Sequence, residues 1–512
     1  MTAEQKSILG KLESQVPHLV RAVNRQLKEK SLKTRQCCFH LLSELLRVYP
    51  GALGSQMSQL MPGVTLAMTD KLTNSSMKID TLDFLATSLA SHPPQTFHPY
   101  VKTLVPLLTR AVNDPFYKVS AEALAVVQSL TLVLRPDGGP ETQQPAQNGF
   151  SQSVVELYGA VFDKLKSADI DQEVKERAIG CAGLLLAKFG DCLAEQMEVS
   201  LALLLDRLRN EMTRLTTVKS LSLLAASPLR LPLGPILDET VAQLADFLRK
   251  NQRSLRIASL QLLQSLVEHP EEKSYWASVE AGRRAKLLAE MPPLVGDHDL
   301  HVSQLALQFL AAVVSQSTPS DPLGGPDGRT LLGQLLARAC LLARSPVLQG
   351  ATLDSLLAFF EAVNKAPLRE KPSAKEMAQE VTAPVSEGAQ LARQSHLSLA
   401  KVAACLAASA PTEKESLAMA KGWLGQLGKI GSGGGGGDQQ QALDVFSLLA
   451  IGELGRRRPD LFKGSSPLSK ADSAILGAFQ SPVEETKTAA SYALGSLAVG
   501  DLERYLPVVL DQ

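Results

Sequence analysis

The chain has 512 residues with 52 basic and 52 acidic side chains, so its formal net charge is zero. This balance argues against direct nucleic-acid binding, because phosphate contacts call for an excess of basic residues. Hydrophobic residues make up 45% of the chain and aromatic residues only 4%, a profile typical of helices rich in leucine and alanine.

The first residues, MTAEQKSILGKLE, are too polar for a signal peptide. No run of about 18 apolar residues follows, so we expect no membrane span and no membrane partner. None of the six cysteines shows CxxC spacing: Cys37, Cys38, Cys181, Cys192, Cys340 and Cys405. We expect buried thiols in a reducing compartment rather than disulfides or zinc ligands.

A unit of two amphipathic helices recurs about eleven times, with no strand pattern between copies. The second helix of each pair is predicted to begin near Leu32, Ser76, Tyr117, Asp171, Met212, Gln252, Asp299, Ser345, Gly388, Gln439 and Ser481. Most intervals are close to the roughly 40–47 residues of HEAT or armadillo units. The predicted fold is therefore all-α: one continuous α-solenoid, or superhelix, of about eleven HEAT/ARM-type helix pairs.

The first three pairs are assigned to residues 1–135, and a flexible loop to residues 136–150, which contain PDGGPETQQPAQNG. Residues 151–430 are predicted to hold pairs four to nine and the first helix of the tenth. A Gly-rich linker follows at 431–438, and residues 439–512 hold the remaining helices of pairs ten and eleven. The pattern is weakest between Lys365 and Pro384.

The fourth pair illustrates the packing that these stripes predict. Apolar residues recur every three or four positions, which places them on one face of each helix: Val154, Leu157, Val161 and Leu165 in the first helix, and Val174, Ala178, Cys181, Leu185 and Phe189 in the second. Asp171 is predicted to cap the second helix, and Gly190 with Asp191 to end it. The two stripes should bury against each other.

Motifs for chemistry are weak, and we predict neither an enzyme nor a cofactor. Gly431, Gly433 and Gly436 satisfy GxGxxG, but between helical patterns rather than between a strand and a helix. A divalent metal at His298 and His301 is less consistent with the pattern than a polar turn in which Asp299 caps the next helix. No catalytic, cofactor-binding or metal-binding residue is assigned.

A candidate protein-binding row consists of basic residues near the starts of successive second helices: Lys33, Arg35, Lys78, Lys118, Lys175, Arg177, Arg214, Lys219, Arg253 and Arg256. If these helices line one surface, the row would attract an acidic partner. The alternative is that these side chains pair with acidic residues of the neighbouring layer, as Asp114 could with Lys118.

Several long strings carry a more specific signal. KEKSLKTRQCCFHLLSELLRVYPGAL at 28–53, ADIDQEVKERAIGC at 168–181 and RLRNEMTRLTTVKSLSLLAASPL at 207–229 resemble the cullin-associated, neddylation-dissociated proteins. The resemblance continues through RSPVLQGATLDSLLAFFEAV at 344–363 and AASYALGSLAVGDLERYLPVVL at 489–510. It is collinear from about Ser14 to the last residue.

This resemblance implies a non-enzymatic regulator of the ubiquitin-like conjugation pathway. Such a protein would bind an unneddylated cullin with its RING subunit and promote substrate-receptor exchange and assembly of SCF and other cullin-RING ubiquitin ligases. The resemblance also implies an interaction with the TATA-binding protein and a location in cytoplasm and nucleus. The alternative function is a general HEAT-repeat interaction scaffold or carrier, of the transport or phosphatase-scaffold type.

The match corresponds to the middle of the family's longer superhelix. The final residues, LERYLPVVLDQ, look like half of the next helix pair, so we expect a fragment, a short isoform or an incomplete gene model. Complete exchange activity is therefore not implied.

Overall fold

The computed structural model describes residues 3–136, 149–167, 169–268, 274–318, 321, 323, 326–368, 371–428, 438–464 and 466–510. Over these residues the regular elements are helices and no strand occurs, which confirms the predicted all-α class. The chain divides into two compact units, Met1–Gln243 and Leu244–Gln512. The division falls within one helix, and the sequence pattern, which predicts one continuous array, gave no sign of it.

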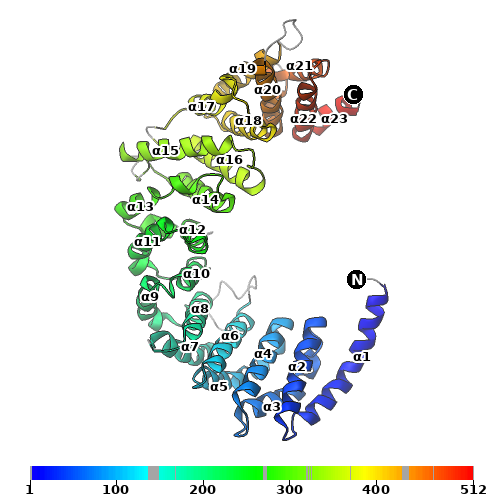
Figure 1. Ribbon diagram of the computed structural model, residues 1–512, viewed down its shortest axis with the longest axis vertical. Coiled ribbons are helices and arrows are strands. Elements are labelled where there is room, and N and C mark those ends of the chain that lie inside the picture. The colour runs from blue at the N-terminus through cyan, green and yellow to red at the C-terminus, as the bar shows by residue number, and fades with distance from the viewer. Residues whose placement is uncertain are drawn as a thin grey trace. The chain divides into compact units, whose positions relative to one another are not determined.

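Unit 1 is built from alternating first and second helices. They are α1 (Ala3–Gln26), α2 (Leu32–Val48), α3 (Met57–Thr69), α4 (Ser75–Ser91), α5 (Val101–Val112), α6 (Tyr117–Leu134), α7 (Ser151–Lys166), α8 (Gln172–Phe189), α9 (Ala194–Arg209), α10 (Arg214–Ala225) and the first part of α11 (Gly234–Arg249). The second helices α2, α4, α6, α8 and α10 pack in chain order as one row, and the first helices form the other (Figure 1).

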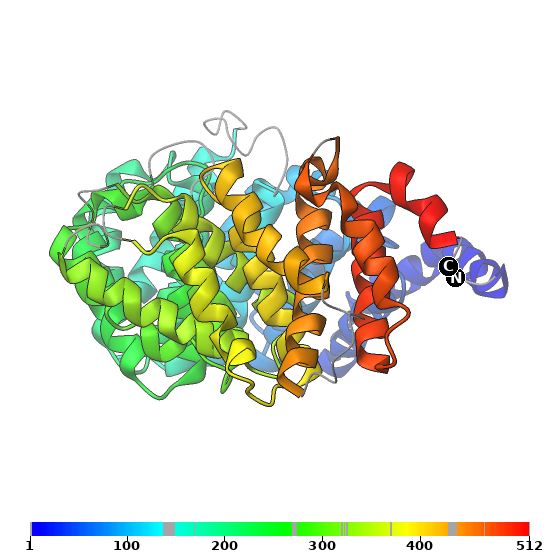
Figure 2. The ribbon, with the colours of Figure 1, turned by 90° about the horizontal axis from the view of Figure 1, so that it is seen from above.

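Unit 2 continues the same alternation. It contains the rest of α11, α12 (Arg253–Val267), α13 (Ala281–Leu288), α14 (Leu300–Gln316), α15 (Pro326–Ala343), α16 (Gly350–Lys365), α17 (Ala374–Ser386), α18 (Arg393–Ala408), α19 (Glu413–Leu427), α20 (Asp438–Arg457), α21 (Ala471–Ala478), α22 (Glu484–Gly500) and α23 (Leu502–Leu510). Figure 2 shows α18, α20 and α22 side by side, coloured from yellow to red, and each packs on the next.

Short 3-10 helices occupy several connections: Gly54–Gln56, Pro94–Thr96, His98–Tyr100, Tyr275–Ser278, Pro292–Leu294, Pro459–Phe462 and Pro467–Lys470. Eleven of the described helices begin within a few residues of the starts predicted for second helices. Residues 137–148, in the predicted loop, and residues 431–437, in the predicted Gly-rich linker, lie outside the described residues.

The apolar stripes of the fourth pair are buried as predicted. Val154, Leu157, Val161 and Leu165 of α7 and Val174, Ala178, Cys181, Leu185 and Phe189 of α8 are all in the core. The carboxylate of Asp171 accepts the backbone N–H of Glu173 at 2.8 Å, which confirms Asp171 as the cap of α8. Gly190 follows directly after the last residue of this helix.

The second helices approach one another most closely where glycine removes the side chain. A Cβ atom built on Gly452 of α20 would lie 2.5 Å from the Cα atom of Ala493 in α22. That separation is far inside van der Waals contact, so only glycine allows the two backbones this distance. Small residues therefore determine the spacing of α20 and α22.

One described helix, α6, is long and apolar enough to cross a membrane by length and composition, although 61% of that stretch is buried inside the stack. It packs between α4 and α8 in the row of second helices. Burial on both sides accounts for its apolar character, because a helix covered by neighbours has little polar surface.

Candidate interaction surface

Three members of the predicted basic row join neighbouring layers. Arg35 of α2 donates to Asp70 at 2.9 Å, at the end of α3. Lys78 of α4 and Asp114, between α5 and α6, pair at 2.6 Å. In unit 2 the same arrangement joins Arg253 of α12 to Asp299, the cap of α14, at 2.6 Å. Each cation of a second helix thus meets a carboxylate preceding the next second helix.

Two of these ion pairs lower the pKa values of their acidic partners. Hydrogen bonding to Arg35 lowers the pKa of the Asp70 carboxyl, and hydrogen bonding to Arg253 lowers the pKa of the Asp299 carboxyl. Arg35 is buried, whereas Arg253 is 62% exposed, so the first pair contributes more to stability than the second.

Three further members of the row are committed to local contacts. Arg214 is buried and lies 3.6 Å from Glu211. The guanidinium of Arg256 donates to the backbone oxygen of Leu248 at 3.0 Å. Arg177 lies 3.7 Å from Glu173, one turn earlier on α8. These side chains support helix starts more than they offer charge to a partner.

The alternative of pairing with acids of the neighbouring layer is confirmed for Arg35, Lys78 and Arg253, but the example of Asp114 with Lys118 is wrong. Asp114 pairs with Lys78 of the preceding second helix instead, because the stacking of layers brings that ammonium group to it. The Lys118 ammonium lies over the ring of Tyr117, 5.9 Å from its centre. Lys118 is exposed, as are Lys33 and Lys219, and Lys175 is half-buried. These four lysines are the members of the row best placed to meet a partner, and their binding role stays a prediction.

A buried arginine that sequence analysis missed links α6 to the turn after α8. Arg135 is 2% exposed, and its two terminal nitrogens donate to the two carboxylate oxygens of Asp191, each at 2.9 Å. Its guanidinium also lies 5.1 Å from the centre of the Phe189 ring. No local motif marks this pair, because its partners are 56 positions apart.

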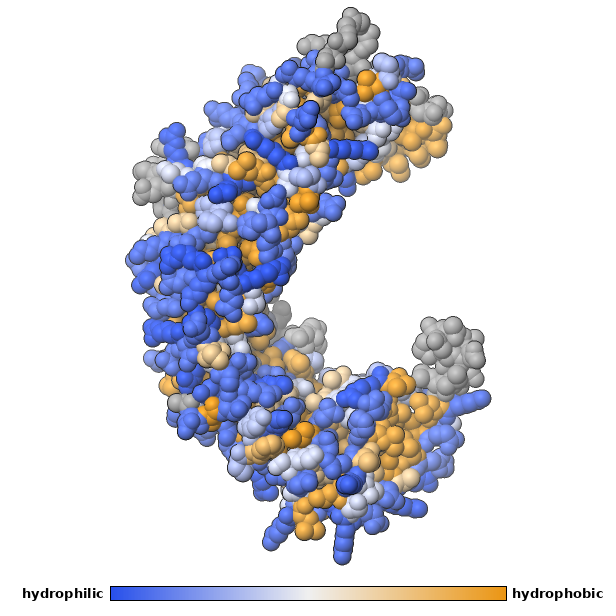
Figure 3. Space-filling model, viewed as in Figure 1, coloured by the Kyte–Doolittle hydropathy of each residue, from blue (hydrophilic) through white to orange (hydrophobic). Residues whose placement is uncertain are grey.

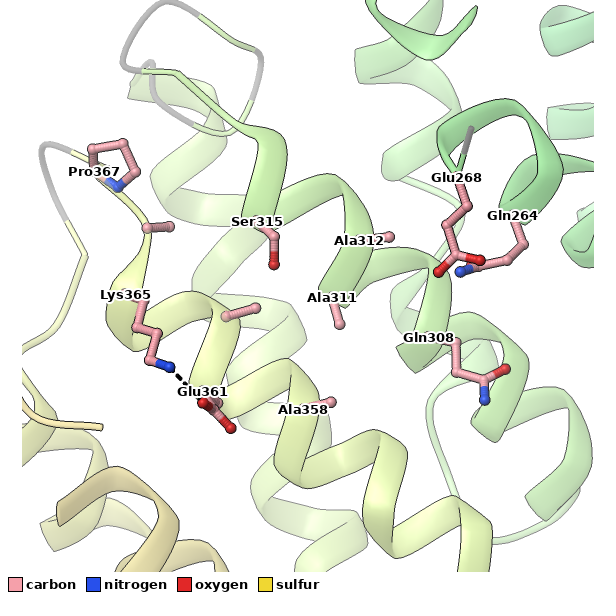
Figure 4. A pocket seen from close by; sticks show the side chains of 12 residues that line it. Gln264, Glu268, Gln308, Ala311, Ala312, Ser315, Ala358, Glu361, Lys365 and Pro367 are labelled. Carbon is pink, nitrogen blue, oxygen red and sulfur yellow. Dashed lines mark hydrogen bonds and ion pairs between the residues drawn. The ribbon is translucent and has the colours of Figure 1, made fainter. Parts of the chain in front are cut away.

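A cavity of about 660 Å³ lies across α12, α14 and α16 in unit 2 (Figure 4). Alanines, including Ala311, Ala312 and Ala358, line its middle, with Glu268 at one side and Glu361 at the other. Lys365 donates to Glu361 at 2.6 Å. Gln264, Gln308 and Ser315 complete the polar part of the lining.

The polar turn before α14 is built as predicted. Asp299 caps α14 by accepting the backbone N–H of Val302 at 3.2 Å. Asp297 instead accepts a hydrogen bond from the hydroxyl of Ser345 at 2.8 Å, while His298 and His301 are exposed. Over the described part of the chain, no group of three His, Cys, Asp or Glu side chains is placed to hold a metal ion.

The cysteines differ in exposure, although all six are free thiols. Cys38, Cys181, Cys340 and Cys405 are buried as predicted, Cys192 is half-buried, and Cys37 is exposed. Burial raises the pKa of the Cys340 thiol to about 12 and that of the Cys405 thiol to about 11. Buried thiols of this kind are unreactive.

Apolar side chains also gather on the last described helix, α23. Leu502, Leu506, Val509 and Leu510 are exposed there, and Figure 3 shows apolar residues gathered over α23. Leu510 is 76% exposed.

Known proteins share sequence with this chain. Residues 51–182 match the family model described as CAND1-like, TPR repeats. The chain is 38% identical to Cullin-associated NEDD8-dissociated protein 1 of Drosophila melanogaster over 519 residues, 97% of this chain and 39% of that protein. It is also 38% identical to Cullin-associated NEDD8-dissociated protein 2 of Mus musculus over 513 residues, 98% of this chain and 39% of that protein. The chain resembles the cullin-associated proteins along almost its whole length.

These matches confirm the resemblance predicted from the sequence strings. The chain nevertheless spans only about two fifths of the length of the cullin-associated relatives. Among solved structures, a mutant of Kap121p superimposes with a TM-score of 0.58 at 13% identity, covering 98% of this chain and 50% of that chain. At that identity the likeness concerns the fold alone, and it supports the predicted α-solenoid.

Proposed function

We propose that this chain is a non-enzymatic scaffold that binds an unneddylated cullin together with its RING subunit. The observation that carries the proposal is the similarity to cullin-associated proteins over 97–98% of the chain. A stack of helix pairs supports it physically, because such a stack presents an extended surface and needs no reactive cleft. The wider role in substrate-receptor exchange and ligase assembly is proposed with it.

Three exposed lysines of unit 1 and the half-buried Lys175 are proposed to contribute to this binding. Lys33, Lys118, Lys175 and Lys219 lie on four different second helices, α2, α6, α8 and α10. These helices belong to one packed row, and the four charges are proposed to act on one partner surface. An acidic surface on the cullin would be steered toward such a row.

The test is a pull-down of purified, unmodified cullin–RING core by the full chain at low and high salt. Binding is expected, and reversal of all four lysines to glutamate is expected to weaken it by about tenfold or more at low salt. The matched control reverses four exposed basic residues of first helices: Lys11, Arg25, Lys102 and Arg110.

The two parts of the proposal fail separately. If the wild-type chain binds no cullin–RING core, and a version extended at both ends to the length of its relatives also binds none, the proposed function is wrong. If binding is retained by the lysine variant while circular dichroism shows it folded, the basic row has no part in it.

Two further assignments are proposed from the same resemblance. The chain is proposed to bind the TATA-binding protein, and to reside in cytoplasm and nucleus. Co-purification with the TATA-binding protein and imaging of a tagged chain would test each one.

A further inference from the structure

A second cavity, of about 950 Å³, lies along the amino-terminal halves of α18, α20 and α22 in unit 2. Its volume is in the range of sites that take a ligand or several side chains of a partner. Leu397, Val445, Leu449 and Ala489 provide apolar surface from all three helices. The cavity is therefore a shared product of three repeats, which no single pair would form.

The charged groups of this lining are mostly acidic. Asp438, Glu484 and Glu485 face one cationic residue, Arg393. Each of the three acids lies in the first turn of its helix, where its negative charge is stabilised by the positive end of the helix dipole. Their presence alone therefore says nothing about a ligand. What makes them relevant to binding is that they line the same cavity as the apolar residues.

Glu485 keeps its charge available to that cavity. Its carboxylate accepts a hydrogen bond from the neutral amide of Gln441 at 2.8 Å. Glu484, in contrast, has Lys487 at 3.7 Å. The neutral donor orients Glu485 without cancelling its negative charge, which leaves a fixed carboxylate next to apolar walls.

Tyr492 adds a held aromatic ring to the lining. Its hydroxyl donates to Glu453, which is 2% exposed, and Lys401 lies 3.8 Å from the same carboxylate. The hydrogen bond fixes the position of the ring at the wall of the cavity. Tyr492 lies seven residues after Glu485, about 10 Å further along α22, so its ring adds aromatic surface to the wall at a distance from that carboxylate. A planar guanidinium suits such a lining, because it pairs with carboxylates and packs on aromatic surface.

We propose that this cavity receives an arginine side chain, flanked by an apolar residue, from a partner protein. Its aliphatic stem would contact Leu397 and Val445, and its guanidinium would pair with Glu485 and Asp438. Charge complementarity selects this occupant: an acidic segment would meet three carboxylates, and a purely apolar one would leave them buried without a partner. The inference does not depend on cullin binding.

The test uses two small probes with the full chain, N-acetyl-leucyl-arginine amide and its neutral isostere N-acetyl-leucyl-citrulline amide. Saturation-transfer NMR with competition should show binding of the arginine probe. The affinity of the citrulline probe should be lower by about tenfold or more. The double variant Asp438→Asn with Glu485→Gln should lose this preference, whereas Glu503→Gln on α23 should keep it.

A second variant separates loss of charge from loss of folding. Ala442→Trp places an indole in the cavity without removing a carboxylate, and it should abolish binding of both probes while the melting temperature stays near that of the wild type. Equal binding of the two probes, an unchanged preference in the double variant, or no binding of the arginine probe at millimolar concentration would each overturn the proposal.

Discussion

The pairing of Arg135 with Asp191 shows how much one side chain can contribute between repeats. The guanidinium is 2% exposed, and both of its terminal nitrogens donate to the Asp191 carboxylate. One of them also donates to the backbone oxygen of Lys188. A bidentate pair in this setting is costly to break, because the remaining charge stays buried without its counter-ion.

Replacing Asp191 with alanine should therefore lower the free energy of unfolding by about 3 kcal/mol. Urea denaturation followed by circular dichroism measures the change. The control is Asp163→Ala, an exposed acid on α7, which should change stability by less than about 0.5 kcal/mol. Equal effects of the two substitutions would contradict the role assigned to the buried pair.

His92 gives unit 1 a dependence on pH. Its Nε2 atom accepts the backbone N–H of Leu53 at 3.2 Å, and its Nδ1 atom lies 2.8 Å from the backbone oxygen of Ser88. The neutral ring with the proton on Nδ1 satisfies both contacts. Burial lowers the pKa of His92 below its ordinary value of 6.5, so the folded chain takes up this proton less readily than the unfolded chain.

The stability supplied by neutral His92 should therefore be complete above about pH 7 and be lost as pH falls below 6.5. Unfolding free energies at about pH 7.5 and about pH 5.5 measure this loss. The loss of unfolding free energy between the two pH values should be smaller in His92→Gln than in the wild type. The control substitution His40→Gln, at an exposed position, should leave this loss unaltered. An identical loss in all three proteins would refute the assignment.

At this scale the sequence predicts what is local and misses what is distant. The caps Asp171 and Asp299 follow from their places before apolar stripes. The partner of Lys78 cannot be predicted in this way. Asp114 is close to Lys118 in the sequence, but the stacking of layers brings it to Lys78 of the preceding second helix. Pair partners across layers depend on how helices are offset, which periodicity does not encode.

At the scale of elements, the contact of α20 with α22 depends on glycine at position 452. A side chain there would meet the Ala493 backbone, which cannot move without separating the helices. Gly495 offers the opposite case, since a Cβ atom on it would have no other atom within 4 Å. The two positions form a matched pair of helical glycines.

Gly452→Leu should destabilise the chain by about 2 kcal/mol or more, because overpacking forces the backbones apart. Gly495→Ala should stabilise it by about 0.5–1 kcal/mol, because alanine restricts the unfolded chain and suits an exposed helix position. Thermal denaturation of both variants is the measurement. A stable Gly452→Leu protein would show that α20 and α22 are not fixed at this distance.

Helix starts were predicted to within a few residues because each second helix carries a long apolar stripe after a polar turn. The region from Lys365 to Pro384 was harder, since α17 is only 13 residues long and contains Pro384. A local signal was nevertheless present: Ser373 and Glu376 form a capping box at its start. The sequence S-x-x-E predicts such a start when read alone.

At the scale of the whole molecule, helices pack on their near neighbours in the chain. Coupling in such arrays passes from one repeat to the next, so damage should remain near its origin. The division into two compact units sharpens that expectation. Stability should therefore be a regional property rather than one value for the chain.

Hydrogen exchange measured by mass spectrometry tests this with Gly452→Leu. Peptides from α18 to α22 should exchange faster than in the wild type, whereas peptides from residues 1–243 should be unchanged. Faster exchange throughout both units would indicate one cooperative fold instead.

The function could not be predicted from the same features as the fold. Charge balance, period and small-residue packing are common to helical arrays of many functions, and the Kap121p likeness extends over 98% of the chain at 13% identity. The cullin-associated resemblance rests on particular sequence strings and not on the polarity pattern. The binding residues stay a prediction, since layer-to-layer pairs use some of the same basic positions.

The exposure of a single thiol has a practical consequence. Cys37 lies one turn after Lys33 on α2, whereas the other cysteines are buried or half-buried. A maleimide dye should therefore attach at Cys37 first, with no cysteine removed by mutagenesis. A change in the fluorescence of this dye would report binding of a partner near Lys33, and its time course would give the association rate.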